Sequence, residues 1–208
     1  MKLVEKPKEN PYWLTLPNLL TLFRFLLIPF FLSELIKGEM FKAFLIFLLA
    51  GLTDLLDGWV ARLWNLRTPL GRILDPAADK LLLVSAFLVT SISRFSHPYS
   101  MPPWLTAAVI SRDTLIALGA LVLFLWKRIK TFSPSLWGKI STFLQVLTVL
   151  FVLFANALAE KNYCHAGFIE NIFSQKIQTY LFVLTFIATV ISGIHYTTFG
   201  FKKGFFSH

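Results

Sequence analysis

Residues 54–79 read DLLDGWVARLWNLRTPLGRILDPAAD, a short polar connection between two apolar segments with aspartates on both sides. Asp54 and Asp57 are three residues apart at the end of the first segment. Asp75 and Asp79 are four residues apart near the start of the second. Both spacings place the paired acids on one face of a helix. The connection contains a proline and a glycine, which commonly interrupt helices. We therefore expect two antiparallel helices that bring four carboxylates opposite one another.

The rest of the chain is strongly apolar. It has 208 residues, of which 56% are hydrophobic, and a mean hydropathy of +0.66, which excludes an ordinary soluble domain. Six segments approach the roughly 20 residues that a helix needs to cross a bilayer. They are residues 18–36, 41–61, 72–93, 103–126, 137–159 and 179–201. We expect an all-α polytopic membrane protein with six transmembrane helices, in which residues 1–208 form one domain, made of an N-terminal segment (1–17) and a bundle (18–201).

The distribution of basic residues predicts how the chain is oriented, because Lys and Arg are retained on the cytoplasmic side of a membrane. They gather at both chain ends and in the second and fourth connections, and they are sparse in the other connections. Both termini and the aspartate stretch are therefore expected on the cytoplasmic side. The net charge of +9 indicates contact with anionic lipid headgroups, not with nucleic acid, because the basic residues flank apolar segments.

The acids need a reason to lie in such segments, since an Asp at the centre of a transmembrane helix costs roughly 3 kcal/mol. That cost falls in a wet cavity, so we expect the carboxylates to face an interior that opens to the cytoplasm. Gly58 and Ala61 continue the stripe of Asp54 and Asp57 and leave room for a ligand.

Facing carboxylates repel one another unless cations neutralise them. Oxygen ligands suit Mg²⁺ or Mn²⁺, and a two-ion site serves phosphoryl-type transfer. Arg62 could hold a phosphate at the cytoplasmic edge. Two alternatives remain: an ion or proton pathway, and simple pairing of the acids with Lys80, Arg62 or Arg72. The chain shows no repeated halves of the kind common in transporters.

Eight positions in this stretch resemble the signature D-x-x-D-G-x-x-A-R-x8-G-x-x-x-D-x-x-x-D of the CDP-alcohol phosphotransferases. They are Asp54, Asp57, Gly58, Ala61, Arg62, Gly71, Asp75 and Asp79. PNLLTLFR (17–24), ISRD (110–113) and LWGKISTFLQ (136–145) are similar to other parts of bacterial phosphatidylglycerophosphate and cardiolipin synthases. The resemblance covers most of the chain.

The resemblance implies a homodimeric enzyme of the bacterial inner (cell) membrane whose site faces the cytoplasm. It would transfer a phosphatidyl group from CDP-diacylglycerol to a small polar or lipid alcohol and release CMP. The implied ligands of two divalent ions, Mg²⁺ or Mn²⁺, are Asp54, Asp57, Asp75 and Asp79. Asp79 would also take the proton of the acceptor hydroxyl. Asp57, Gly58, Ala61, Arg62 and Gly71 would bind the nucleotide.

Cations elsewhere in the chain are candidates for the acceptor. A phosphorylated alcohol needs positive charge beside an acidic cluster, which favours Arg112 and Lys139. The alternative for Arg112 is neutralisation by the adjacent Asp113. Asn18, Thr21 and Arg24 recur at three-residue intervals in the first segment, so we expect this stripe to line the interior cavity.

The identity of the acceptor follows from the resemblance alone. Glycerol 3-phosphate, giving phosphatidylglycerophosphate, is the first expectation, because the first two segments resemble those synthases. The chain has SRD at 111–113 where they typically have SRE, and this departure also fits a cardiolipin synthase that uses phosphatidylglycerol. Inositol phosphate and serine are further alternatives.

Overall fold

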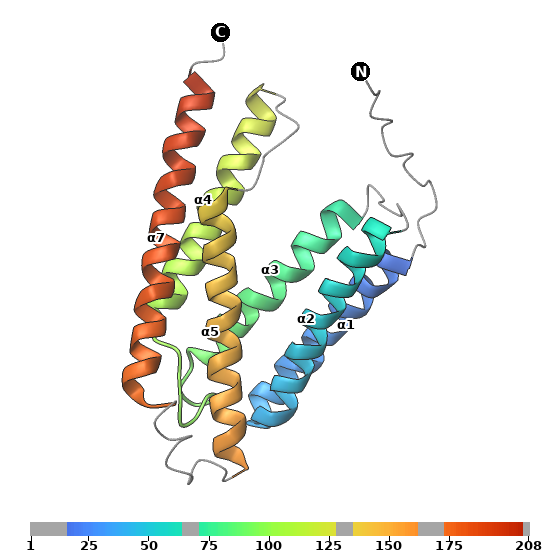
Figure 1. The fold of residues 1–208 in the computed structure, drawn as a ribbon, viewed down its shortest axis with the longest axis vertical. Coiled ribbons are helices and arrows are strands. Elements are labelled where there is room, and N and C mark those ends of the chain that lie inside the picture. The colour runs from blue at the N-terminus through green and yellow to red at the C-terminus, as the bar shows by residue number, and fades with distance from the viewer. Residues whose placement is uncertain (1–15, 64–70, 128–134, 162–172, 206–208) are drawn as a thin grey trace.

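The computed structural model describes residues 16–63, 71–127, 135–161 and 173–205, and these form an all-helical protein (Figure 1). Six helices account for nearly all of the described residues. They are α1 (Leu16–Lys37), α2 (Met40–Leu63), α3 (Gly71–Thr90), α4 (Pro103–Lys127), α5 (Leu136–Glu160) and α7 (Gln175–Phe205). Each of the six apolar segments predicted from the sequence is a helix, and the all-α prediction is confirmed. The predicted N-terminal segment, residues 1–17, lies outside the described residues except for the start of α1.

Three of these helices contain stretches long and apolar enough to cross a membrane, namely Asn18–Lys37, Leu136–Glu160 and Gln175–Thr198. The other three carry the aspartates, with Asp54 and Asp57 in α2, Asp75 and Asp79 in α3, and an Arg–Asp pair in α4. The chain is therefore an integral membrane protein in which apolar helices accompany more polar ones. Charged side chains of this kind belong in the interior of a bundle, because lipid offers them no partners.

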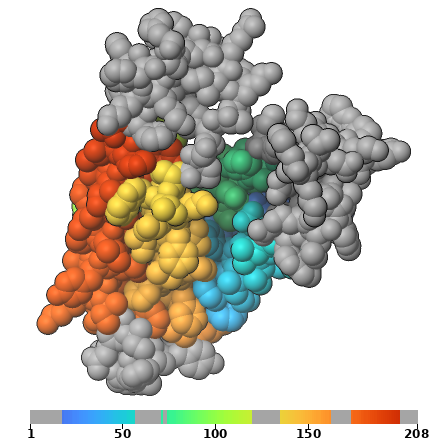
Figure 2. Space-filling view, turned by 45° about the horizontal axis from the view of Figure 1, so that its top comes forward, coloured from blue at the N-terminus to red at the C-terminus, as the bar shows by residue number. Residues whose placement is uncertain are grey.

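The helices form two groups (Figure 1). In the first group, α1 packs against both α2 and α3, while in the second group α7 packs against α4 and α5. The main packing between the groups is that of α2 on α5, and Figure 2 shows the surface of α5 between those of α7 and α2. Charged side chains gather within the first group and again where α3 meets α4 of the second group.

A single apolar core holds the two groups together. It contains side chains from every helix, including Phe31, Phe47, Phe87, Leu105, Leu153 and Phe182. The rings of Phe31 and Phe47 lie 5.6 Å apart between centroids and join α1 to α2. Large apolar side chains also cover the outside, among them Phe30 and Phe143, as expected where helices face lipid. Packing inside the bundle therefore relies on shape and on buried polar contacts as well as on apolar burial.

Candidate functional site

The acidic side of the candidate site is formed where α1 meets α2 and α3. Asp54 comes from α2, Asp75 and Asp79 come from α3, and α1 supplies Thr21 and Arg24 as their partners. The hydroxyl of Thr21 donates a hydrogen bond of 2.5 Å to Asp75 Oδ1. The antiparallel course of α2 and α3 thus places their acids against one face of α1.

Arg24 is the centre of this cluster. Its Nη1 atom lies 2.9 Å from Asp54 Oδ1 and 2.5 Å from Asp79 Oδ1, so one nitrogen contacts acids from two helices. The Arg24 side chain is fully buried, whereas Asp54 and Asp79 are 40% and 43% exposed. A buried guanidinium is costly unless carboxylates compensate its charge, and these two do so. Asp54 and Asp79 lie between the buried Arg24 and the surface.

The stripe of Asn18, Thr21 and Arg24 is buried in the structure, with exposed fractions of 7%, 0% and 0%. Their three-residue spacing predicted that they line the interior cavity; the side chains do face the interior, while a cavity beside them stays a prediction. Two of the three, Thr21 and Arg24, contact the aspartates directly. Whether they serve a ligand stays a prediction.

The described acids can be tested for their fit to a divalent cation. Asp54 and Asp79 Oδ1 atoms contact the same cationic nitrogen, so carboxylates from α2 and α3 already lie within reach of one positive charge. Carboxylate oxygen is also the donor that Mg²⁺ and Mn²⁺ prefer. Among the described side chains, no three Asp, Glu, His or Cys residues gather as a metal site. The two acids supply oxygen donors of the kind such an ion prefers, while the four-acid arrangement stays a prediction.

Several residues of the predicted nucleotide site cannot be placed beyond their helix. Asp57, Gly58, Ala61 and Arg62 belong to α2, but their side chains lie outside the described part of the structure. Gly71 is the first residue of α3 and is buried. It begins the helix that carries Asp75 and Asp79, so the predicted nucleotide and metal residues share α3.

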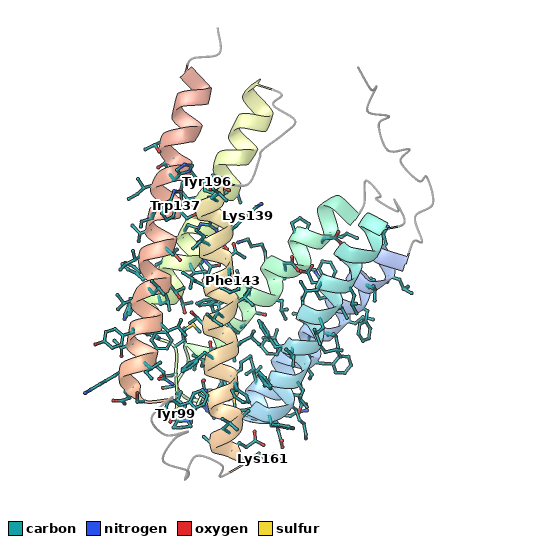
Figure 3. All side chains as sticks on the ribbon, viewed as in Figure 1. Tyr99, Trp137, Lys139, Phe143, Lys161 and Tyr196 are labelled. Carbon is teal, nitrogen blue, oxygen red and sulfur yellow. The ribbon has the colours of Figure 1, made fainter. Side chains whose placement is uncertain are left out.

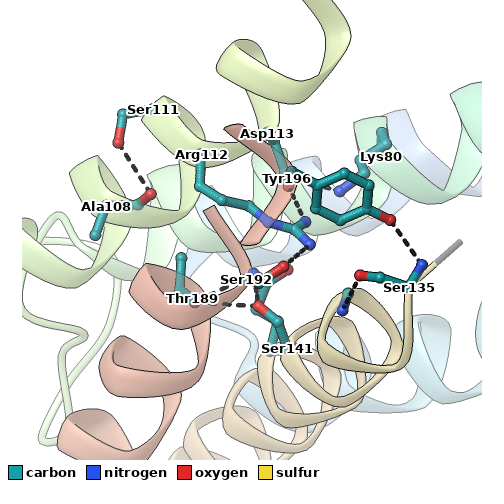
Figure 4. A network of polar contacts seen from close by, with 12 residues as sticks. Lys80, Ala108, Ser111, Arg112, Asp113, Ser135, Ser141, Thr189, Ser192 and Tyr196 are labelled. Atoms are coloured by element: carbon teal, nitrogen blue, oxygen red, sulfur yellow. Dashed lines mark hydrogen bonds and ion pairs between the residues drawn. The ribbon is translucent and has the colours of Figure 1, made fainter. Parts of the chain in front are cut away.

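A second charged cluster joins α4 and α7 of the other helix group to α3 (Figure 4). Arg112 on α4 is buried; its Nη1 lies 2.6 Å from Asp113 Oδ1, and its Nη2 donates a hydrogen bond of 2.6 Å to Ser192 Oγ on α7. Lys80 on α3 makes an ion pair with the other oxygen of Asp113. Asp113 thus bridges two cations, and the suggested neutralisation of Arg112 by Asp113 is present.

Lys139, the other predicted acceptor residue, lies on the first turn of α5 and is exposed. Its helix begins next to Tyr196 of α7 (Figure 3), and the Tyr196 ring lies near Arg112. The roles of Arg112 and Lys139 in acceptor binding stay a prediction. Sequence reasoning did not identify Tyr196 or Ser135 as part of this region, because their contact joins positions 61 residues apart.

Comparison with known proteins agrees with the resemblance. A family model described as CDP-alcohol phosphatidyltransferase matches residues 14–199. A protein of Aquifex aeolicus is 31% identical over 192 residues, which cover 92% of this chain and 99% of the relative. A protein of Haemophilus influenzae is 39% identical over 141 residues (64% and 72%), and one of Escherichia coli K12 is 37% identical over 142 residues (66% and 76%). All three relatives are named CDP-diacylglycerol–glycerol-3-phosphate 3-phosphatidyltransferase.

Proposed function

The chain belongs to the CDP-alcohol phosphatidyltransferase family, and on that premise we propose that it transfers a phosphatidyl group from CDP-diacylglycerol to glycerol 3-phosphate. The products are phosphatidylglycerophosphate and CMP. The names of the relatives support this donor and this acceptor. They do not favour phosphatidylglycerol as the acceptor, and membership of an enzyme family speaks against a transporter. The SRD sequence at 111–113 is thus a variation within the phosphatidylglycerophosphate synthases.

The structural observation that carries the proposal is the meeting of acids from α2 and α3 at one cationic nitrogen. The family is generally dependent on divalent metal. We assign Asp54, Asp57, Asp75 and Asp79 as the ligands of two ions, Mg²⁺ or Mn²⁺. When bound, such ions neutralise the pyrophosphate and stabilise the charge that passes to CMP.

Asp79 is assigned as the base. The acceptor hydroxyl loses its proton to Asp79 as its oxygen bonds to the phosphorus that carries diacylglycerol, and the bond from that phosphorus to the CMP oxygen breaks. Arg24 engages Asp79 Oδ1 and so holds the carboxylate in a fixed orientation; we assign the proton to Oδ2. Holding the hydroxyl and the phosphorus in contact supplies a further part of the rate enhancement.

The two substrates bind to chemically distinct parts of the proposed site. Small residues Gly58, Ala61 and Gly71 leave room for cytidine, and Asp57 and Arg62 complete the nucleotide site. Arg112 and Lys139 bind the phosphate of glycerol 3-phosphate, because a dianion needs cations to offset the acids nearby. The buried stripe of α1 supplies Thr21 and Arg24 as partners of the acids.

The proposed site faces the cytoplasm of a bacterial inner membrane. Six helices cross the membrane and both termini are cytoplasmic, which agrees with the abundance of Lys and Arg at the chain ends. The beginning of α1 and the end of α7 lie toward the same end of the bundle in Figure 1, as an even number of spans requires. The enzyme is proposed to act as a homodimer.

The experiment that tests the function uses purified protein, labelled CDP-diacylglycerol, Mg²⁺ or Mn²⁺, and one acceptor at a time. We expect CMP and phosphatidylglycerophosphate in equal amounts with glycerol 3-phosphate, and no product with phosphatidylglycerol, inositol phosphate or serine. Cardiolipin formed from phosphatidylglycerol would contradict the acceptor. Ion movement in proteoliposomes without CMP release would contradict the enzyme.

A further inference from the structure

Tyr196 lies at the junction of three helices, although nothing in the proposed reaction uses it. It belongs to α7, its hydroxyl contacts the residue before α5, and its ring lies near Arg112 of α4 (Figure 4). Arg112 and Lys139, the two residues proposed to bind the acceptor phosphate, come from α4 and α5. Tyr196 therefore contacts elements that carry both halves of that site.

The contact with α5 is close and specific. The backbone N–H of Ser135 donates a hydrogen bond of 3.1 Å to Tyr196 Oη, and Ser135 Oγ accepts one of 3.0 Å from Gly138 N. Ser135 is the N-cap of α5, so both bonds satisfy N–H groups at the start of a helix. The hydroxyl of Tyr196 thus fixes the position at which α5 begins.

Gly138 shows how closely α5 lies on the tyrosine. A Cβ atom at position 138 would be 2.9 Å from Tyr196 Oη and 3.0 Å from Cε2, which is too close for either to stay in place. The first turn of α5 can lie on the ring because this residue lacks a side chain. Lys139 is the next residue, so its position along the bundle follows from this contact (Figure 3).

The contact with α4 involves the same face of α7. Ser192 and Tyr196 are four residues apart, and Ser192 Oγ accepts the hydrogen bond from Arg112 Nη2. The Arg112 guanidinium carbon lies 5.8 Å from the centroid of the Tyr196 ring, within the range of a cation–π interaction. One turn of α7 therefore holds Arg112 through a hydroxyl and an aromatic ring, and holds α5 through the tyrosine hydroxyl.

We propose that Tyr196 is a positioning residue that sets the separation of Lys139 and Arg112, and so the affinity of the enzyme for the acceptor phosphate. The proposal rests on the proposed function, in which these two cations bind glycerol 3-phosphate. Loss of the hydroxyl releases the first turn of α5 from α7, while the ring still lies by Arg112. The lysine then samples positions from which it cannot reach the phosphate together with Arg112.

The first experiment compares Tyr196→Phe with Tyr180→Phe, the same change at an exposed position of the same helix. In Tyr196→Phe we expect the KM for glycerol 3-phosphate to rise about fivefold, the effect of one hydrogen bond. The KM for CDP-diacylglycerol and kcat should stay as in the wild type, and Tyr180→Phe should leave all three constants unchanged. A purely structural role for Tyr196 would lower the active fraction, and hence the apparent kcat, without a selective change in one KM.

The second experiment uses the close approach of Gly138. In Gly138→Ala the added methyl group displaces the tyrosine hydroxyl, so we expect a similar rise in the KM for glycerol 3-phosphate. In the double variant Gly138→Ala/Tyr196→Phe, the alanine should raise the KM for glycerol 3-phosphate less than it does alone, since the contact with Tyr196 Oη has already been lost and only that with the ring remains. Independent, multiplicative effects of the two changes would overturn the coupling through α5.

The results separate the inference from its premise. If the wild type forms no phosphatidylglycerophosphate, the proposed function fails, and the inference fails with it. If the wild type forms the product and Tyr196→Phe keeps the wild-type KM for glycerol 3-phosphate, the inference alone is overturned. A rise in the KM values of both substrates together would also contradict it, because the proposal concerns the acceptor phosphate only.

Discussion

The two charged clusters of the molecule have central charges of opposite sign. In the first, between α1, α2 and α3, one buried cation, Arg24, contacts two partly exposed acids. In the second, between α3, α4 and α7, one largely buried acid, Asp113, contacts two cations, the buried Arg112 and the partly exposed Lys80. The first cluster therefore presents negative charge at its open side, and the second presents the positive charge of Lys80. An enzyme that joins a metal-bound pyrophosphate to a phosphorylated alcohol needs both.

Helix α3 connects the two clusters through adjacent residues. Asp79 pairs with Arg24 of α1, whereas Lys80 pairs with Asp113 of α4. Successive side chains of a helix point about 100° apart, so one helix can serve two neighbours. Each buried charge thus has a counter-ion of its own, and the partly exposed charges of the two clusters, Asp54 and Asp79 on one side and Lys80 on the other, are of opposite sign.

The largest effect is expected from replacing Asp79, the proposed base in the acidic cluster. Asp79→Asn keeps the shape of the side chain but cannot take a proton, so turnover should fall by at least about a hundredfold. Binding of CDP-diacylglycerol should persist, which an equilibrium binding assay can check. The same change in the other cluster, Asp113→Asn, should retain measurable turnover at saturating acceptor. Normal turnover in Asp79→Asn would remove this residue from the base role.

The next effect concerns the counter-ion of the acids. Arg24→Gln leaves Asp54 and Asp79 facing each other without their cation, and should lower the free energy of unfolding by about 2 kcal/mol in a chelator. Added Mn²⁺ should stabilise this variant more than the wild type, because the acids then lack a competing positive charge. Arg94→Gln, at an exposed position, is the matched control for thermal unfolding. Equal stabilisation of all three proteins by Mn²⁺ would show that Arg24 and the ion do not share the acids.

The basic cluster is tested by removing its cations. Arg112→Ala and Lys139→Ala should raise the KM for glycerol 3-phosphate, by about tenfold for the arginine, since each removes a charge-assisted contact with phosphate. Binding of CDP-diacylglycerol should not change. Steady-state kinetics with each substrate varied in turn separate the two effects. Unaltered acceptor kinetics in both variants would place the acceptor elsewhere.

The smallest effect concerns the link between the clusters. Lys80→Met removes the ion pair with Asp113, and because the lysine side chain is 43% exposed the loss of stability should be no more than about 1 kcal/mol. Lys176→Met on the exposed start of α7 is the control. Thermal unfolding checks both. A loss several times larger in Lys80→Met would mean that the clusters depend on each other for folding.

The sequence predicted the acidic cluster far better than the basic one, for a physical reason. Asp54, Asp75 and Asp79 lie in a short hairpin with helical spacing, and the buried stripe of α1 shows the same periodicity. In apolar helices that face lipid on one side and protein on the other, hydrophobicity does not reveal which face packs against a neighbour. The contacts of Arg112 with Ser192 and of Ser135 with Tyr196 depend on that packing, and span 80 and 61 residues. The sequence also did not predict which acid pairs with Lys80, because several acids were possible partners.

One measurement tests the central claim most directly. It follows the release of CMP from CDP-diacylglycerol in the presence of glycerol 3-phosphate, after divalent ions have been removed completely. That claim is that carboxylates of α2 and α3 act on the donor through divalent cations. We expect the wild-type protein to release no CMP in the chelator and to recover when Mg²⁺ or Mn²⁺ is restored, whereas Asp79→Asn should not recover. Release of CMP at the full rate in the chelator would contradict the account.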